Sequence, residues 1–247
     1  MGALRVVLAH RDARLLYLSQ WLLMLVLGGA RFVFPWLLVT REGSAVAGSL
    51  PWAVGAGAYV LAAIPAGMVG DRVSRRAMLA WAAGLQALLL AALAAGAAAS
   101  GDGLPAWAAV LGAFLLGVAL PFLDSAAFGK LVQLLGERHL TGGGSLLIAA
   151  ETGGQLAGAL LFGLLSEAGA VAPLAGMGAA AALAAGACIA IRDPLRGAHA
   201  GGRGLRQVRT GFALLLGVRR IRRLIVVAVL ANLAQPAAAR VGAAQGI

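Results

Sequence analysis

The stretch AMLAWAAGLQALLLAALAAGAAASG, residues 77–101, decides the fold class of this chain. It contains no Asp, Glu, Lys or Arg, and it is dominated by Ala and Leu, which both favour helix. A helix of about 20 mostly apolar residues is long enough to cross the hydrocarbon core of a bilayer. The stretch has no alternation of period two and is too long for a barrel strand, so it predicts a transmembrane helix.

Similar stretches occur on both sides of it. Of all residues 61% are hydrophobic and only 12% are charged, whereas soluble domains carry about 25% charged residues. Lipid must therefore be the solvent for most of the chain, and we predict an all-α, polytopic membrane protein. The expected helices are 14–40, 46–69, 77–100, 104–129, 142–166 and 171–191, with a partial seventh starting near 223.

The basic residues are distributed unequally between the segments that join these helices. Alternate segments hold 17 of the 20 Lys and Arg, and the opposite set holds only Arg41 and Arg240. Basic segments stay on the cytoplasmic side of a membrane, so we expect a cytoplasmic N-terminus. A net charge of +11 would suggest nucleic acid as the partner of a soluble protein, but this distribution indicates a lipid bilayer instead.

The chain divides into three parts on this pattern. Residues 1–192 form a six-helix transmembrane bundle, 193–222 a basic cytoplasmic linker, and 223–247 a partial seventh helix with a tail that loses hydrophobicity. In the linker, Leu205, Val208 and Phe212 follow helical spacing among arginines, which predicts an amphipathic helix on the inner leaflet. A disordered positive linker is the alternative.

The segment between the second and third helices reads GMVGDRVSRRAML, residues 67–79. It resembles the loop signature of the major facilitator superfamily, G-x-x-x-D-R-x-x-R-[RK]-x-x-L, at every specified position. The resemblance implies a conformational gate formed by Gly67, Asp71, Arg72, Arg75 and Arg76. From the residues alone, Gly67 would allow a close helix approach, Asp71 would cap a helix start, and the arginines would hold the turn at the membrane surface. A plain positive-inside turn is the alternative.

Two further stretches resemble one branch of that superfamily, the bacterial macrolide, drug and siderophore exporters. FLDSAA, residues 122–127, is similar to its F-x-D-P-A region with Ser in place of Pro, and 224–234 is similar to its seventh helix. Over residues 10–235 the resemblance implies a six-helix N-terminal half, located in a bacterial inner membrane, of a proton-coupled exporter of small organic molecules. No cofactor is expected, because the proton gradient drives such transport.

Glycines four residues apart lie in the fifth predicted helix, at Gly154 and Gly158. Small residues at this spacing let helices pack closely. The run also partly resembles the superfamily's antiporter signature, with Ala159 in place of Pro. Helix packing is the preferred interpretation.

Three ionisable residues lie inside predicted helices: Arg31, Asp124 and Glu151. Each costs about 2.5–3.5 kcal/mol or more at the bilayer centre, so each needs a partner, water or a function. Asp124 and Glu151 lie at similar depth, roughly 9 and 13 Å from the inner ends of their helices, so they can form a facing pair that holds a proton. Arg31 is expected to face the central cavity or an anionic substrate, too far from Glu151 for direct pairing. The alternatives are a structural cap for Asp124 and an outward snorkelling Arg31.

Other classes of protein have no support in the sequence. The three His residues fall in predicted loops, and no zinc-protease, Walker or dinucleotide motif occurs, so we expect neither an enzyme nor a metal site. The superfamily has twelve helices, and this chain ends within the seventh. We expect a truncated transporter that needs its missing C-terminal half, or alternatively a half-size scaffold or subunit that dimerises.

Overall fold

The computed structural model describes residues 10–70, 73–101 and 103–192. The chain divides into two compact units, Met1–Ala200 and Gly201–Ile247, and all described residues belong to the first. The predicted linker helix and the partial seventh helix lie outside the described residues.

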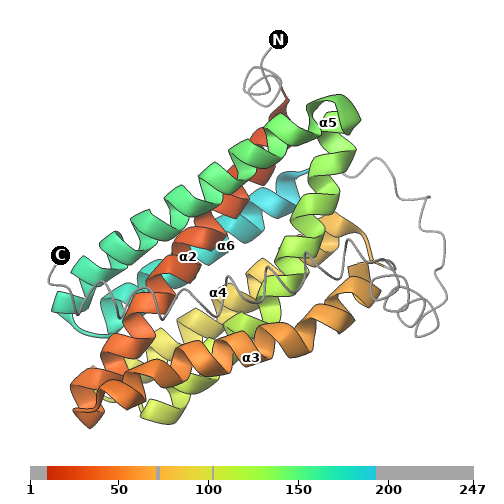
Figure 1. Ribbon diagram of the computed structural model, residues 1–247. Coiled ribbons are helices and arrows are strands. Elements are labelled where there is room, and N and C mark those ends of the chain that lie inside the picture. The colour runs from red at the N-terminus through yellow and green to blue at the C-terminus, as the bar shows by residue number, and fades with distance from the viewer. Residues whose placement is uncertain (1–9, 71–72, 102, 193–247) are drawn as a thin grey trace, which may run out of the picture. The chain divides into compact units, whose positions relative to one another are not determined.

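The described part of the chain is helical throughout and contains no strand, which confirms the all-α prediction for these residues. Figure 1 shows the helices as a bundle. Six segments are long and apolar enough to cross a membrane. The elements are α2 (Arg11–Glu42), α3 (Ala45–Gly70), α4 (Arg75–Ala99), α5 (Ala106–Leu165), a short 3-10 helix η1 (Ser166–Ala168) and α6 (Val171–Ala190).

The long helix α5 corrects one expectation. We expected two helices joined by a loop at about 130–141, but the backbone is helical from Ala106 to Leu165. Residues 130–141 contain no proline, and most of them are tolerated in a helix, so this polar, charged segment keeps a helical backbone through the bend that joins the two spans. The ribbon reverses direction there (Figure 1), and the two apolar spans, Ala106–Leu135 and His139–Ala168, remain distinct. We call the parts Ala106–Leu135 and His139–Leu165 the first and second arms of α5.

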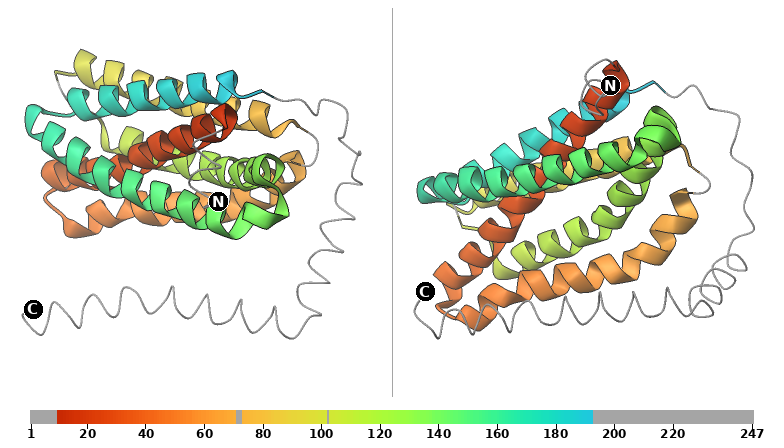
Figure 2. Two further views of the ribbon diagram at one scale, coloured as in Figure 1. Left: turned by 90° about the horizontal axis from the view of Figure 1, so that it is seen from above. Right: turned by 45° about the horizontal axis from the view of Figure 1, so that its top comes forward.

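Within this unit the helices are unequally covered. Helix α2 packs against both α5 and α6, and α4 packs mainly against α6. In the left view of Figure 2, α4 and α6 lie on one side of the unit, and α3 and the second arm of α5 lie on the other. In the most apolar window of each span, 17% of α3 and 22% of the second arm is buried, against 61% of α2 and 44% of the other three. The least covered helices therefore share one side.

Glycines bring the helix backbones into contact at the crossing of α2 with the second arm of α5. A Cβ placed on Gly158 would lie 1.9 Å from the carbonyl oxygen of Leu25, and one placed on Gly28 would lie 2.0 Å from that of Gln155. Any side chain at either position would overlap the opposite backbone. The absence of side chains is thus what permits this crossing, as is common between helices in membranes.

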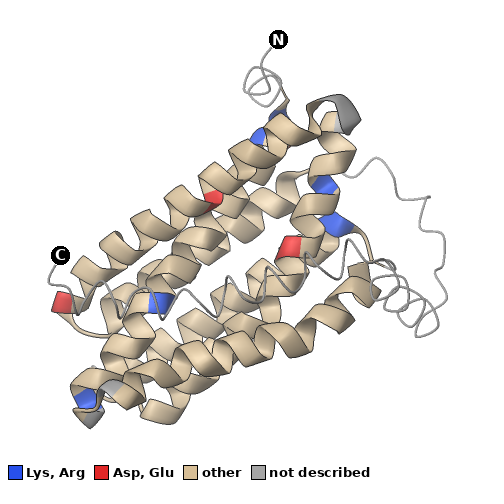
Figure 3. Ribbon diagram, in the orientation of Figure 1, with Lys and Arg blue, Asp and Glu red and all other residues tan. Residues whose placement is uncertain are grey.

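One end of the unit carries most of the described basic residues, and Figure 3 shows most charges toward the helix ends. We call this the basic end, defined by Arg11, Arg14, Arg75, Arg76 and Lys130. Interhelical hydrogen bonds join the helices there. The buried Lys130 Nζ donates to the carbonyl oxygen of Arg192 at 3.2 Å, and Arg76 donates to that of Ile189.

The hydroxyl of Tyr17 on α2 donates to the carbonyl oxygen of Gly143 on the second arm of α5 at 2.8 Å, in a buried position. Tyr17→Phe removes only this hydroxyl and leaves the ring in place. We expect the free energy of unfolding in detergent to fall by about 0.6 kcal/mol, the average for such bonds between helices in membranes. An unfolding midpoint equal to that of the wild type would show that this bond contributes nothing.

Candidate functional site

Arg31, inside α2, contacts residues of two other helices. Its Nη1 donates a hydrogen bond of 2.7 Å to Oε1 of Gln155 on the second arm of α5. Its guanidinium also lies over the ring of Trp52 on α3, 5.0 Å from the centroid, within the range of a cation–π interaction. Arg31 therefore joins α2, α3 and α5 at one level of the span.

Asp124, on the first arm of α5, is the centre of a second group. Its Oδ2 accepts a hydrogen bond of 3.2 Å from the hydroxyl of Tyr59 on α3. The carboxylate of Glu151, on the second arm, lies within range of electrostatic repulsion from that of Asp124. Two acidic groups and a phenol, from three spans, thus interact within the unit, Tyr59 with Asp124 by a hydrogen bond and Asp124 with Glu151 by charge repulsion.

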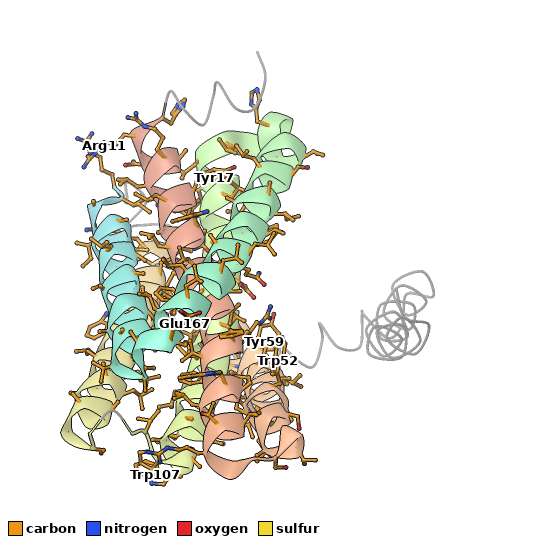
Figure 4. The ribbon with its side chains drawn as sticks, turned by 90° about the vertical axis from the view of Figure 1, so that its left-hand side faces the viewer. Arg11, Tyr17, Trp52, Tyr59, Trp107 and Glu167 are labelled. Carbon is orange, nitrogen blue, oxygen red and sulfur yellow. The ribbon has the colours of Figure 1, made fainter. Side chains whose placement is uncertain are left out.

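The two groups belong to a single face. Gln155 follows Glu151 by one helical turn, and Tyr59 follows Trp52 by two, so each pair lies on one side of its helix. Figure 4 shows Trp52 and Tyr59 near each other on α3 at the edge of the unit. Trp52, Tyr59 and Arg31 are exposed, and the other three side chains are half-buried. We call this set the polar face: Arg31, Trp52, Tyr59, Asp124, Glu151 and Gln155.

The three ionisable residues singled out from the sequence all belong to this face. Asp124 lies about three helical turns before the end of the first arm of α5 at Leu135, so it is not placed at a helix end that it could cap. Among the described residues, Arg31 donates its hydrogen bond to Gln155, one turn from Glu151, and not to Glu151 itself. The face thus has a cationic part at Arg31 and an acidic part at Asp124 and Glu151.

The loop motif between α3 and α4 is only partly described, because Asp71 and Arg72 lie outside the described residues. The start of α4 is capped by Ser74, whose hydroxyl oxygen accepts a hydrogen bond of 3.2 Å from the amide of Ala77. The guanidinium of Arg75 fills the space that a side chain at Gly129 would occupy. Of the motif arginines, Arg75 and Arg76 therefore contact the unit's own helices.

Gly67 behaves differently from the expectation. We expected a close helix approach there, but a Cβ placed on Gly67 would meet nothing within 4 Å among the described residues. The residue is exposed, on the weakly covered helix α3. A close approach at Gly67 would need a partner from outside the described unit.

Gly154 and Gly158 lie in the crossing of α2 with the second arm of α5. A Cβ on Gly154 would lie 2.5 Å from the carbonyl oxygen of Trp21. A Cβ on Gly158 would lie even closer to the carbonyl oxygen of Leu25. This geometry is that of helix packing. Among the described residues, no group of three or more His, Cys, Asp or Glu is arranged to hold a metal ion.

Sequence reasoning missed three members of the polar face: Trp52, Tyr59 and Gln155. A signal for Gln155 was present, because it is a polar residue one helical turn from Glu151. A signal for Tyr59 was its position as a polar residue in an otherwise apolar span. Trp52 gave no such signal, because nothing in the sequence shows that its ring lies beneath Arg31.

Comparison with known proteins finds no relative of this chain. No protein-family model matches the chain, and neither a curated protein nor a solved structure matches it. The polar face and the loop motif are therefore the features of this chain that point to a function.

Proposed function

We propose that this unit is one half of a major facilitator transporter that exports a small organic molecule in exchange for protons. The observation that carries the proposal is the polar face, which gathers ionisable and aromatic side chains from α2, α3 and both arms of α5 inside membrane-length helices. Charged groups at such depth are expensive and mark the paths of substrates, ions or protons.

The roles follow from the chemistry of the residues. Asp124 and Glu151 repel each other, and a pair of carboxylates at one site can relieve that repulsion by sharing a proton. Export would be coupled to the proton gradient if this proton is taken up from the outside and released to the cytoplasm in exchange for the substrate. Arg31, held by Gln155 and Trp52, would contact the substrate.

A second six-helix half would complete the binding site. The weak coverage of α3 and the second arm of α5 supports this, because these helices flank the polar face and expose Gly67. The proposed setting is a bacterial inner membrane, with the basic end in the cytoplasm. The second half is either a C-terminal half of the same transporter or a second subunit.

The alternative function is a half-size scaffold or a dimerising subunit without transport of its own. The same weakly covered helices would support it, because they need a partner in either case. The two functions differ in the role of the polar face: a scaffold needs the helices together but does not need a titrating carboxylate among them.

A transport assay tests the proposal. Proteoliposomes would contain the chain alone or with the polypeptide encoded directly downstream of it, an acidic interior, and erythromycin or ethidium outside as probes. We expect at least one probe to accumulate above its level in protein-free liposomes, in one of the two preparations, and a protonophore to abolish the difference. Probe levels equal to those of protein-free liposomes in both preparations would overturn the proposal and favour the scaffold.

A further inference from the structure

We infer that the polar face binds an amphoteric molecule, with its anionic group at Arg31 and its amine at Asp124 and Glu151. The inference rests on the proposed function and specifies the chemical class of its substrate. It follows from the separation of opposite charges on one face, which a molecule of a single charge would satisfy only in part.

The cationic part of the face lacks an anion. Among the described residues, the guanidinium of Arg31 makes one hydrogen bond, to a neutral amide, and so uses one of its five N–H donors. The ring of Trp52 covers one side of the cation without neutralising it. A carboxylate or similar anion could take up the remaining donors in two parallel hydrogen bonds.

The acidic part has the opposite need. The hydrogen bond that Asp124 accepts comes from the neutral hydroxyl of Tyr59, and the neighbouring acid Glu151 adds repulsion. No Lys or Arg of the described residues bonds to either carboxylate. An ammonium group placed between them would attract both, and the ring of Tyr59 stands beside it as a further favourable surface for a cation.

The helices set the distance between these two parts. Trp52 and Tyr59, which mark them on α3, are seven residues apart, or roughly 10 Å along a helix, and Gln155 and Glu151 are four apart, or roughly 6 Å. The two rings of α3 lie along this interval. The matching ligand is therefore a rigid, aromatic molecule with an acid at one end and an amine at the other.

The test uses a para-linked biphenyl with an aminomethyl group at one end and a carboxylate at the other. Its methyl ester lacks the anion, and its N-acetyl derivative lacks the cation. Binding of each to the full chain in lipid nanodiscs would be measured by titration calorimetry. We expect the parent compound to bind at least tenfold more tightly than either derivative.

Variants assign the two ends of the ligand. Arg31→Gln should lower the affinity of the parent to that of the ester without changing the ester, and Arg31→Lys should restore part of it. Glu151→Gln should lower the affinity of the parent toward that of the N-acetyl derivative, without changing the affinity of that derivative. The matched controls are Arg41→Gln and Glu167→Gln, outside the polar face, and both should bind like the wild type.

Equal affinity of the three compounds for the wild type would overturn the inference, and so would equal weakening of all three by Arg31→Gln. The transport assay separates this failure from failure of the proposed function. If ethidium or erythromycin moves with the gradient while the biphenyls bind alike, only the amphoteric specificity is wrong. If no probe moves with the gradient, the proposed function is also wrong.

Discussion

Replacing Glu151 by Gln is expected to abolish export driven by a pH gradient. Glutamine has the size and hydrogen-bonding capacity of glutamic acid, but its amide cannot release or take up a proton at any pH of the assay. Glu151 is half-buried and within range of electrostatic repulsion from Asp124, so the variant should preserve the fold while it removes one of the two groups that can share a proton. The measurement is the initial rate of gradient-driven probe accumulation in proteoliposomes.

The control for this variant is Glu167→Gln. Glu167 is also acidic, but it is exposed in the 3-10 helix η1, which follows the end of α5 and is not part of the polar face (Figure 4). We expect its transport rate to equal that of the wild type. Gradient-driven transport by Glu151→Gln at the wild-type rate would remove Glu151 from the coupling mechanism and leave Asp124 as the remaining candidate.

Gly158→Ala should destabilise the unit strongly for so small a change. The added methyl would lie 1.9 Å from the carbonyl oxygen of Leu25, and backbone cannot move aside as a flexible side chain can. The α2–α5 crossing must open, and overpacking of this kind costs roughly 1–3 kcal/mol. Thermal unfolding of the purified protein, followed by fluorescence-detected size exclusion, should show a lower midpoint and less folded protein.

Gly153→Ala is the matched control on the same arm of α5. Its methyl would approach no nearer than 3.9 Å, to Nε1 of Trp21, which is an ordinary contact. Alanine in a helix interior is favoured over glycine by about 1 kcal/mol, so this variant should be as stable as the wild type or more so. Equal midpoints for the two alanine variants would show that the crossing is not tightly packed at Gly158.

The fold was predictable to the extent that one property determined it. A run of apolar residues long enough to cross a bilayer specifies a helix almost without reference to the rest of the chain, and α4 shows this, with expected bounds of 77–100 and observed bounds of Arg75–Ala99. The loop expected at 130–141 failed because charge marks where a chain leaves lipid but does not stop a helix. A glycine in the left-handed conformation does stop one, as at Gly43, whose φ of 64° ends α2.

The candidate site was predictable for its charges but not for their partners. Arg31, Asp124 and Glu151 are conspicuous because ionisable groups in apolar spans are rare. The hydrogen bond from Arg31 to Gln155 joins residues 124 positions apart, and it depends on the rotation of α2 against α5. That rotation is fixed by glycine contacts such as that of Gly158 with Leu25. A single sequence does not show which residue each glycine packs against.

The central claim is that the helices span a membrane with the basic end in the cytoplasm, and cysteine labelling tests it most directly. In a Cys188→Ser background, Val73→Cys marks the basic end and Ser100→Cys the opposite end, and both positions are exposed. With an impermeant maleimide applied to spheroplasts, we expect Ser100→Cys to react at once and Val73→Cys to react only after lysis. Labelling of Val73→Cys in intact spheroplasts would contradict the orientation, and a chain that stays soluble without detergent would contradict the account as a whole.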